Sequence, residues 1–171
     1  MKTIFLAPAN SIHTQRWVDA LHARGVHVVL VTQHDCADWH PPAGLKFYRL
    51  PHSGTAGYFL NAVRLRRIVD YERPDIVNTH YASGYGLTSA LIRYRPTLLS
   101  VWGSDVFDFP YESWLKGRLL RWNLRRADAI ASTSEVMARQ VQRLVPDLAQ
   151  EVSVTPFGVD TRRFAPMPRD R

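Results

Sequence analysis

Val26-His27-Val28-Val29-Leu30-Val31-Thr32 is the stretch of sequence that decides the fold. Four valines and a threonine give it a high density of β-branched side chains, which favour strands over helices. The run from Val28 to Val31 is apolar without alternation, as expected for a strand that is covered on both faces. The stretch therefore predicts a central strand of a parallel sheet.

The residues before this strand predict another strand and a helix. Residues 3–7 form a short apolar run that ends at a proline. Trp17, Ala20 and Leu21 then recur at helical spacing, and Gly25 supplies a typical helix stop. The order is strand, loop, helix, strand.

The same alternation continues after the central strand. Five further strands are predicted at residues 45–50, 75–80, 97–102, 129–133 and 152–155. Helices are predicted from Tyr58 to just before Pro74 and at residues 87–95, 112–126 and 135–144. Seven strands alternating with helices predict a Rossmann-like, doubly wound, mostly parallel α/β sheet. We expect one domain over residues 1–157 and the start of an interdomain linker at 158–171.

Composition narrows the functional classes. The chain has 171 residues, of which 46% are hydrophobic and 22% charged, so it is long enough to bury a core without disulfides. The net charge is +7, and 19 of the 22 basic residues are arginine, which favours an anionic partner. Cys36 is the single cysteine, and no stretch has the length of a signal or membrane segment. We therefore expect a cytoplasmic location.

Polar residues gather after four of the predicted strands. Because the carboxyl ends of parallel strands meet at one edge of the sheet, where ligands bind, these residues form one candidate site. They are Asn10, Ser11, His13 and Thr14; His80, Tyr81, Ser83 and Gly84; Trp102, Gly103, Ser104 and Asp105; and Ser134 and Glu135.

Several of these residues also suit purely structural roles. Ser11, Thr14 and Ser134 are typical helix N-caps, and Asp105 suits an Asx turn or a helix start. His80 could be a core histidine, although its polar neighbours argue against a purely apolar setting.

Familiar cofactor and nucleophile motifs are missing. The dinucleotide-binding motif needs glycines in the turn after the first strand, and this turn has none. Gly84-Tyr85-Gly86 follows the fourth predicted strand instead, so NAD(P) binding is disfavoured. No nucleophile elbow occurs. The alternating His34, Cys36, Asp38 and His40 lack designed metal spacing, so we expect no metal and no cofactor.

One predicted helix carries a basic stripe. Trp114, Arg118, Arg121 and Arg125 recur at spacings that place them on one face. Arginines beside an indole can hold anionic lipid headgroups, so the stripe suggests peripheral membrane docking, although a core helix with a solvated arginine face explains it somewhat better. No base-stacking or RNA-reading motif accompanies the charges, so nucleic acid is not expected.

Taken together, five segments resemble a known family over nearly the whole chain. In order and spacing they are similar to the N-terminal domain of a GT-B glycosyltransferase, from the large retaining family 4 (group 1). The segments are His13-Thr14-Gln15-Arg16-Trp17 with Gly25-Val26-His27-Val28; Pro74-Asp75-Ile76-Val77-Asn78-Thr79-His80-Tyr81; Val101-Trp102-Gly103-Ser104-Asp105-Val106; residues 127–134; and residues 154–160 with 163–166.

The resemblance implies transfer of a sugar from a nucleotide-sugar donor to a polysaccharide or glycolipid acceptor. In this family the N-terminal domain mostly binds acceptor, and the C-terminal domain holds the donor through an E-x7-E pair. No two glutamates of this chain are eight residues apart, so the donor domain is expected to be a separate part.

Carried over position by position, the resemblance assigns two catalytic residues. His80 matches a histidine near the transferred sugar or acceptor, and Gly103 with Asp105 matches an H-G-x-D loop in which Trp102 replaces the usual histidine. We expect His80 to position sugar or acceptor and Asp105 to orient an acceptor hydroxyl.

Two alternatives stay open from the sequence. One is a non-catalytic, membrane-docking subunit of a bipartite transferase. The other is an unrelated Rossmann-like module that binds a nucleotide or anion. The sugar, the nucleotide base and the acceptor are not specified by any residue pattern.

Overall fold

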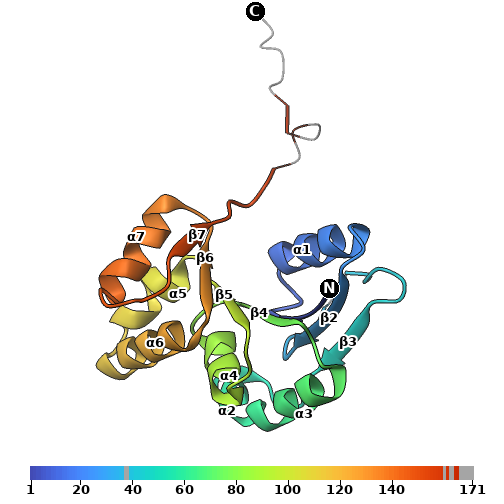
Figure 1. Cartoon of the computed structure of the whole chain (residues 1–171), viewed down its shortest axis with the longest axis horizontal. Coiled ribbons are helices and arrows are strands. Elements are labelled where there is room, and N and C mark those ends of the chain that lie inside the picture. The colour runs from blue at the N-terminus through green and yellow to red at the C-terminus, as the bar shows by residue number, and fades with distance from the viewer. Residues whose placement is uncertain (37–38, 160, 162–163, 166–171) are drawn as a thin grey trace, which may run out of the picture.

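Seven parallel strands form one sheet in the computed structural model (Figure 1), which describes residues 1–36, 39–159, 161 and 164–165. The strand order is β3-β2-β1-β4-β5-β6-β7. All six pairings are parallel, which confirms the predicted Rossmann-like α/β class. The strands are β1 (Lys2–Leu6), β2 (His27–Thr32), β3 (Lys46–Arg49), β4 (Ile76–His80), β5 (Thr97–Ser100), β6 (Ala129–Ser132) and β7 (Val152–Val154).

Helices connect successive strands at almost every crossover. They are α1 (Ile12–Ala23), α2 (Gly54–Leu60), α3 (Ala62–Glu72), α4 (Gly84–Ile92), α5 (Ser104–Phe107), α6 (Trp114–Arg126) and α7 (Glu135–Leu144), with a 3-10 turn at Phe109–Tyr111.

The helix predicted from Tyr58 is two helices, which corrects the sequence reading. Asn61 separates α2 from α3, and its side chain is fully buried. Its amide donates to the His52 carbonyl at 2.7 Å and to Gln33 Oε1 at 3.1 Å, and its Oδ1 accepts from the His52 backbone at 3.1 Å. These bonds tie the helix junction to the loops on either side of β3.

Alternating side chains bury both faces of the sheet around β1 and β2. Phe5, Val28 and Leu30 pack with Val18 of α1 on one face. On the other face, Ile4, Leu6, Val29 and Val31 pack with α3 and α4. The valine-rich stretch is therefore covered on both faces, as predicted. A third cluster joins β5, β6 and β7 to α6 and α7.

A buried ion-pair cluster closes the amino edge of the sheet. Glu72 is 3% exposed and accepts from Lys46 Nζ and from the Tyr48 hydroxyl at 2.6 Å, while Lys2 Nζ lies 2.5 Å from its Oε2. Burial alone would raise the pKa of Glu72, but the bonds from Lys2, Tyr48 and Lys46 outweigh it and lower the pKa to about 2. The polar loops of interest lie at the opposite, carboxyl edge.

Candidate functional site

The candidate site lies where the strand order reverses. β2 and β3 extend from one side of β1 and β5, β6 and β7 from the other side of β4, so the crevice between β1 and β4 is the topological switch point. His80 is the last residue of β4 and stands at this point. Its ring stacks on Phe5 of β1, with 4.3 Å between the ring centroids.

His80 is a buried, neutral hydrogen-bond donor. Its side chain is 2% exposed, and burial lowers its pKa to about 3. Its Nδ1 accepts a hydrogen bond from the Trp102 indole at 3.0 Å, so the proton of the neutral ring is on Nε2. Nε2 is itself buried and has no hydrogen-bond partner among the described residues. A buried donor without a partner costs free energy, so this N–H is free to donate to a ligand that reaches it.

Asp105 joins two of the loops. Its side chain is fully buried. The carboxylate accepts from the backbone of Ala82 at 2.7 Å, of Trp102 at 3.0 Å and of Gly103 at 2.8 Å. Burial raises the pKa of Asp105, and these hydrogen bonds oppose that rise. The acid thus fixes the loops after β4 and β5, and the idea that it orients an acceptor hydroxyl stays a prediction.

An aromatic rim surrounds the crevice. His13, at the start of α1, meets Trp102 edge-on at 5.6 Å and stacks on Phe157 at 4.2 Å between centroids. Tyr81 meets Trp102 edge-on at 6.3 Å, and its hydroxyl lies 2.8 Å from Ser104 Oγ. The rim therefore combines residues from four separate segments, which follow β1, β4, β5 and β7.

Two rim residues have left-handed backbone conformations. Tyr81 has a φ of 78°, although it is not glycine, and Gly103 has a φ of 134°. The Tyr81 amide donates to Ser100 at 3.0 Å, and its carbonyl accepts from Gly86 at 3.0 Å. These bonds hold the loop after β4 in a conformation that an L-residue rarely adopts.

The other predicted site residues lie outside the ring contacts, and a substrate-binding role for them stays a prediction. Ser11 and Ser134 are the N-caps of α1 and α7, as the simpler reading predicted. Asn10 and Glu135 are exposed, and Thr14 is fully buried against the sheet. Ser83 and Gly84 begin α4, where a Cβ on Gly84 would lie 2.4 Å from the Tyr58 ring. These residues do not join the ring contacts around His80.

Sequence reasoning missed three aromatic neighbours of the site. Phe5 and Trp17 flank His80, and Phe157 covers His13 and Trp102. From the sequence, Phe5 belongs only to a predicted strand, and Trp17 only to a predicted helix and to one segment of the family resemblance. Phe157 is the last residue of the predicted domain and lies two residues after the last predicted strand. A large aromatic residue so close to a strand end is the sequence signal that could have revealed it.

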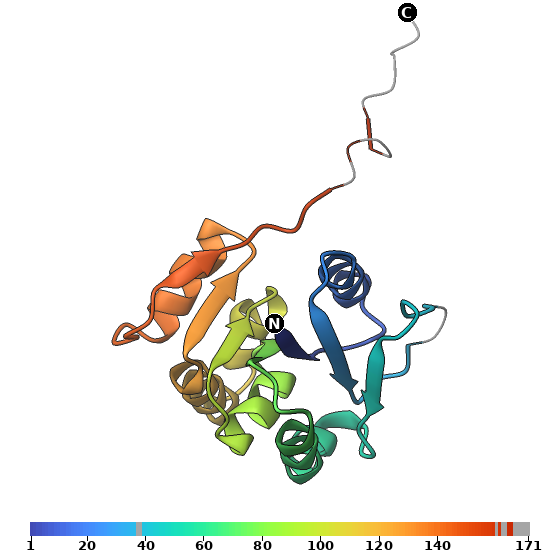
Figure 2. The ribbon, with the colours of Figure 1, turned by 45° about the vertical axis from the view of Figure 1, so that its right-hand side comes forward.

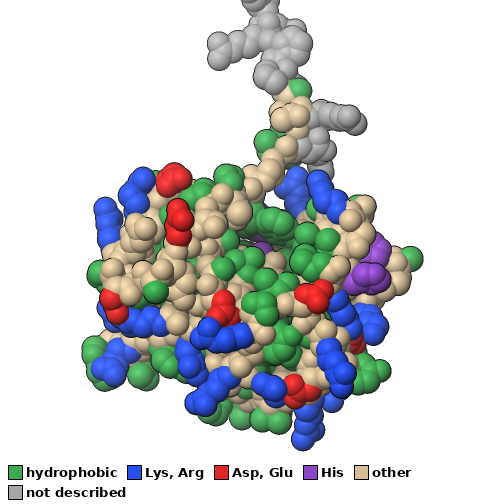
Figure 3. Space-filling model, in the orientation of Figure 1, with side chains coloured by type: hydrophobic (Ala, Val, Ile, Leu, Met, Phe, Trp, Pro, Cys, Tyr) green, Lys and Arg blue, Asp and Glu red, His purple; other side chains and the backbone are tan. Residues whose placement is uncertain are grey.

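A hollow opens beside this rim. It has a volume of about 440 Å³ and lies between α1 and residues 156–159. Its walls include Trp17, Phe157, Arg16 and Arg24. Figure 2 shows the segment after β7 leaving the domain next to α1, and Figure 3 shows hydrophobic side chains around a depression on this side. Aromatic side chains therefore line the hollow, and arginines lie at its edge.

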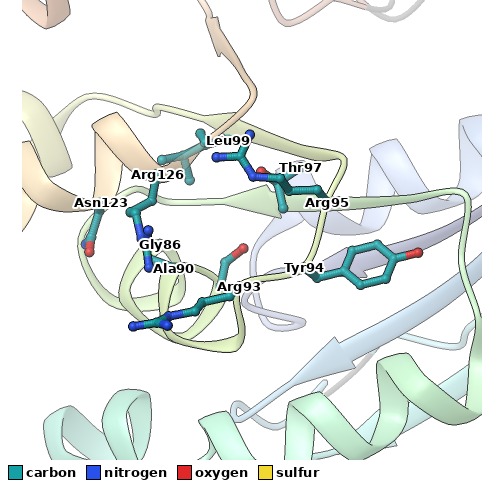
Figure 4. A pocket seen from close by; sticks show the side chains of 11 residues that line it. Gly86, Ala90, Arg93, Tyr94, Arg95, Thr97, Leu99, Asn123 and Arg126 are labelled. Atoms are coloured by element: carbon teal, nitrogen blue, oxygen red, sulfur yellow. The ribbon is translucent and has the colours of Figure 1, made fainter.

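Other features lie away from this site. A small cavity of about 40 Å³ is lined by Arg93, Arg95 and Arg126 (Figure 4). It lies at the amino end of β5, opposite the edge that carries His80.

Among the described residues, no three His, Cys, Asp or Glu side chains gather as a metal site. Asp38 of the histidine-rich loop, and Asp160, Arg163 and Pro166 of the predicted linker, lie outside the described residues.

The basic stripe lies on α6 and shares no residue with the aromatic rim. Trp114 is 74% exposed, and Arg118 and Arg125 are exposed with it, while Arg121 is half-buried. No helix within the described ranges is long and apolar enough to cross a membrane.

The fold and crevice define a class of protein. An all-parallel sheet in this order, with its polar loops at the switch point, is the Rossmann-like half of a GT-B fold. Residues 2–134 match the family described as glycosyl transferase 4-like. The chain belongs to this family. No curated protein sequence matches it.

Solved structures agree on the fold. Sucrose-phosphate synthase from Thermosynechococcus elongatus has a TM-score of 0.73 at 16% identity, covering 98% of this chain and 50% of that one. HepE from Anabaena, in complex with UDP and glucose, has a TM-score of 0.67 at 14% identity, covering 95% and 46%. A UDP-N-acetylglucosamine 2-epimerase from Listeria monocytogenes has a TM-score of 0.65 at 14% identity, covering 88% and 43%. This chain spans about half the length of these structures.

Proposed function

We propose that this chain is the acceptor-side domain of a glycosyltransferase. The enzyme moves a sugar from a nucleotide-sugar donor to a glycan or glycolipid acceptor with retention, on the cytoplasmic side of a membrane. The family match supports glycosyl transfer, and the complexes of HepE with UDP-glucose support a nucleotide-sugar donor. A separate donor-binding domain completes the crevice.

The observation that carries the proposal is the unpartnered N–H of His80. A sugar that loses its nucleotide gains positive character at its ring, while the departing diphosphate gains negative charge. Hydrogen bonds to the sugar or acceptor hydroxyls orient these groups without needing a strong base. A neutral histidine with a fixed Nε2–H meets that requirement, and its low pKa keeps it neutral at every physiological pH.

The surrounding residues act by positioning. Trp102 fixes the ring of His80 through its indole N–H, and Asp105 fixes the backbone on either side of Trp102. Because His80 is buried in this structure, a substrate hydroxyl reaches Nε2 only after neighbouring residues rearrange while the Trp102 indole stays bonded to Nδ1. His13 and Tyr81 then border the acceptor.

Substitution of His80 in the complete protein tests this function. We expect His80→Ala to lower transfer of radiolabelled glucose from UDP-glucose into a membrane lipid extract about 100-fold, the usual effect of losing one aligned donor. His80→Gln, whose Nε2 also bears hydrogens, should recover part of the rate. Arg139→Gln is the control. Arg139 is exposed on the solvent face of α7, so the rate should stay unchanged. Equal rates for wild type and His80→Ala would remove His80 from the site.

The epimerases with this fold suggest a second outcome to monitor. The same assay with UDP-N-acetylglucosamine and no acceptor would reveal 2-epimerisation by sugar analysis of the product. The family match favours transfer, so we expect no epimer to form. Accumulation of the epimer without any transfer product would contradict the proposed transferase.

A further inference from the structure

The outer face of α6 exposes large apolar side chains beside arginines. We define the α6 patch as Trp114, Leu115, Arg118, Arg121, Trp122 and Arg125. Trp114 is 74% exposed, Leu115 67% and Trp122 37%. Gly117, Leu120 and Leu124 fill the opposite face of the helix and explain its packing, so the core does not require the exposed residues to be apolar.

The positive charge of the α6 patch is only partly neutralised. Arg125 pairs with Asp147 at 2.7 Å, and Glu112 pairs with Lys116. Among the described residues, no carboxylate pairs with Arg118 or Arg121. The Arg118 guanidinium lies 5.0 Å from the Trp114 ring centroid, and the patch surrounds a groove of about 520 Å³. The groove therefore offers cations framed by two indoles.

A second surface of the same kind lies on α2 and α3. We define the α2–α3 patch as Phe59, Leu60, Val63, Arg64 and Arg67. Phe59 is 61% exposed, Leu60 51% and Val63 64%, and both arginines are exposed. Val63, Arg64 and Arg67 follow helical spacing on α3, so they share one face, and Phe59 and Leu60 are the last two residues of α2. Sequence analysis had not singled out this surface.

The two patches belong to one layer of helices. α6, α2 and α3 all pack against α4, which lies between them. Figure 1 shows α6, α2 and α3 on the lower side of the domain, while the segment after β7 leaves at the top. In the same orientation, Figure 3 shows hydrophobic and Lys or Arg side chains together along the lower rim. One flat partner could therefore contact both patches.

We propose that the α6 and α2–α3 patches dock this domain on an anionic lipid bilayer. Arginines complement lipid phosphates, and indoles occupy the headgroup level. Leu115, Leu60 and Val63 supply aliphatic side chains that gain from contact with acyl chains but not from a nucleic-acid backbone. The like charges of the patches also disfavour a second copy of the chain as the occupant.

The proposal deepens the proposed function, because it makes the acceptor a lipid-linked glycan. α5 begins at Ser104, on the aromatic rim, and the chain reaches Trp114 of the α6 patch ten residues later. The start of the α6 patch is therefore joined to the rim by the short segment that contains α5 and the 3-10 turn.

Vesicle sedimentation of the complete protein tests the docking. We expect binding to vesicles of phosphatidylcholine with phosphatidylglycerol and little binding to phosphatidylcholine alone. Arg118→Gln with Arg121→Gln should lower the partition coefficient about 30-fold, since each basic residue near the surface contributes about fivefold. Phe59→Ser with Leu60→Ser should lower it about tenfold, and this loss should persist at 1 M salt, where charges are screened.

The matched control removes the same charge from another face. Arg139→Gln with Arg143→Gln on α7 should leave the partition coefficient within a factor of about three. Equal losses in control and patch variants would show a net-charge effect and overturn the proposal. So would binding to single-stranded RNA in place of vesicles, or a dimer that the patch substitutions dissociate. Vesicle binding is measured without catalysis, so its failure is distinct from loss of transfer in His80→Ala.

Discussion

His80 links the chemistry of the crevice to the stability of the fold. Its ring stays neutral because it is buried, and its pKa is lowered from 6.5 to about 3. The unfolded chain instead takes up a proton below about pH 6.5. Between these two values the unfolded state binds more protons, so acid destabilises the native protein.

A pH series isolates this effect. Wild type should lose about 2 kcal/mol more unfolding free energy than His80→Gln when the pH falls from 7 to 5, because glutamine does not titrate. Urea unfolding of both proteins at the two pH values measures the difference. Glu72 does not interfere, because both proteins contain it and its contribution cancels in the comparison. Parallel pH dependence in the two proteins would mean that His80 is charged in the native state.

At the scale of elements, close packing depends on helical glycines, and Gly117 is one of them. A Cβ on Gly117 of α6 would lie 2.9 Å from the backbone carbonyl oxygen of Pro110, which cannot easily yield. Gly86 of α4 is the matched case, because its nearest neighbour would be 3.5 Å away. The two glycines thus lie in similar helices but differ in the space that a side chain would have.

Alanine substitution should therefore have opposite effects at the two positions. Gly117→Ala should destabilise the protein by about 1 to 3 kcal/mol through overpacking against the 3-10 turn. Gly86→Ala should be neutral or stabilise it by up to about 1 kcal/mol, the usual gain in helix propensity. Thermal or urea unfolding compares them. A stabilised Gly117→Ala protein would show that α6 can move away from Pro110 without cost.

The elements were predictable to the extent that they depend on local pattern. The seven strands follow from β-branched and apolar runs, and the strand-end rule placed His80, Trp102 and Asp105 at one edge. The break at Asn61 depends on bonds to Gln33 and His52, which are distant in sequence, so no local periodicity reveals it.

The side-chain geometry of the site needed the structure for the same reason. Sequence position predicts that Trp102 is near His80, but not that its indole donates to Nδ1 and leaves Nε2 free. Nor does it predict that backbone amides occupy the Asp105 carboxylate. Both features depend on side-chain rotamers that the loops after β4 and β5 set together.

At the scale of the whole molecule, the chain should be incomplete for donor binding. Its basic and aromatic groups border only one side of a crevice, and the relatives of known structure are about twice as long. Calorimetric titration of this chain with UDP-glucose should give no saturable heat, and no sugar should be transferred. Tight binding, with a Kd in the micromolar range, would contradict the division of roles between two domains.

The parallel arrangement of all seven strands has an electrostatic consequence. α1, α4 and α7 each follow a strand and begin at its carboxyl edge, so their amino ends point toward the same rim. Each end carries a partial positive charge from its aligned peptide dipoles. This field comes from the backbone, so unlike a histidine or a carboxylate it persists at any pH at which the helices stay folded.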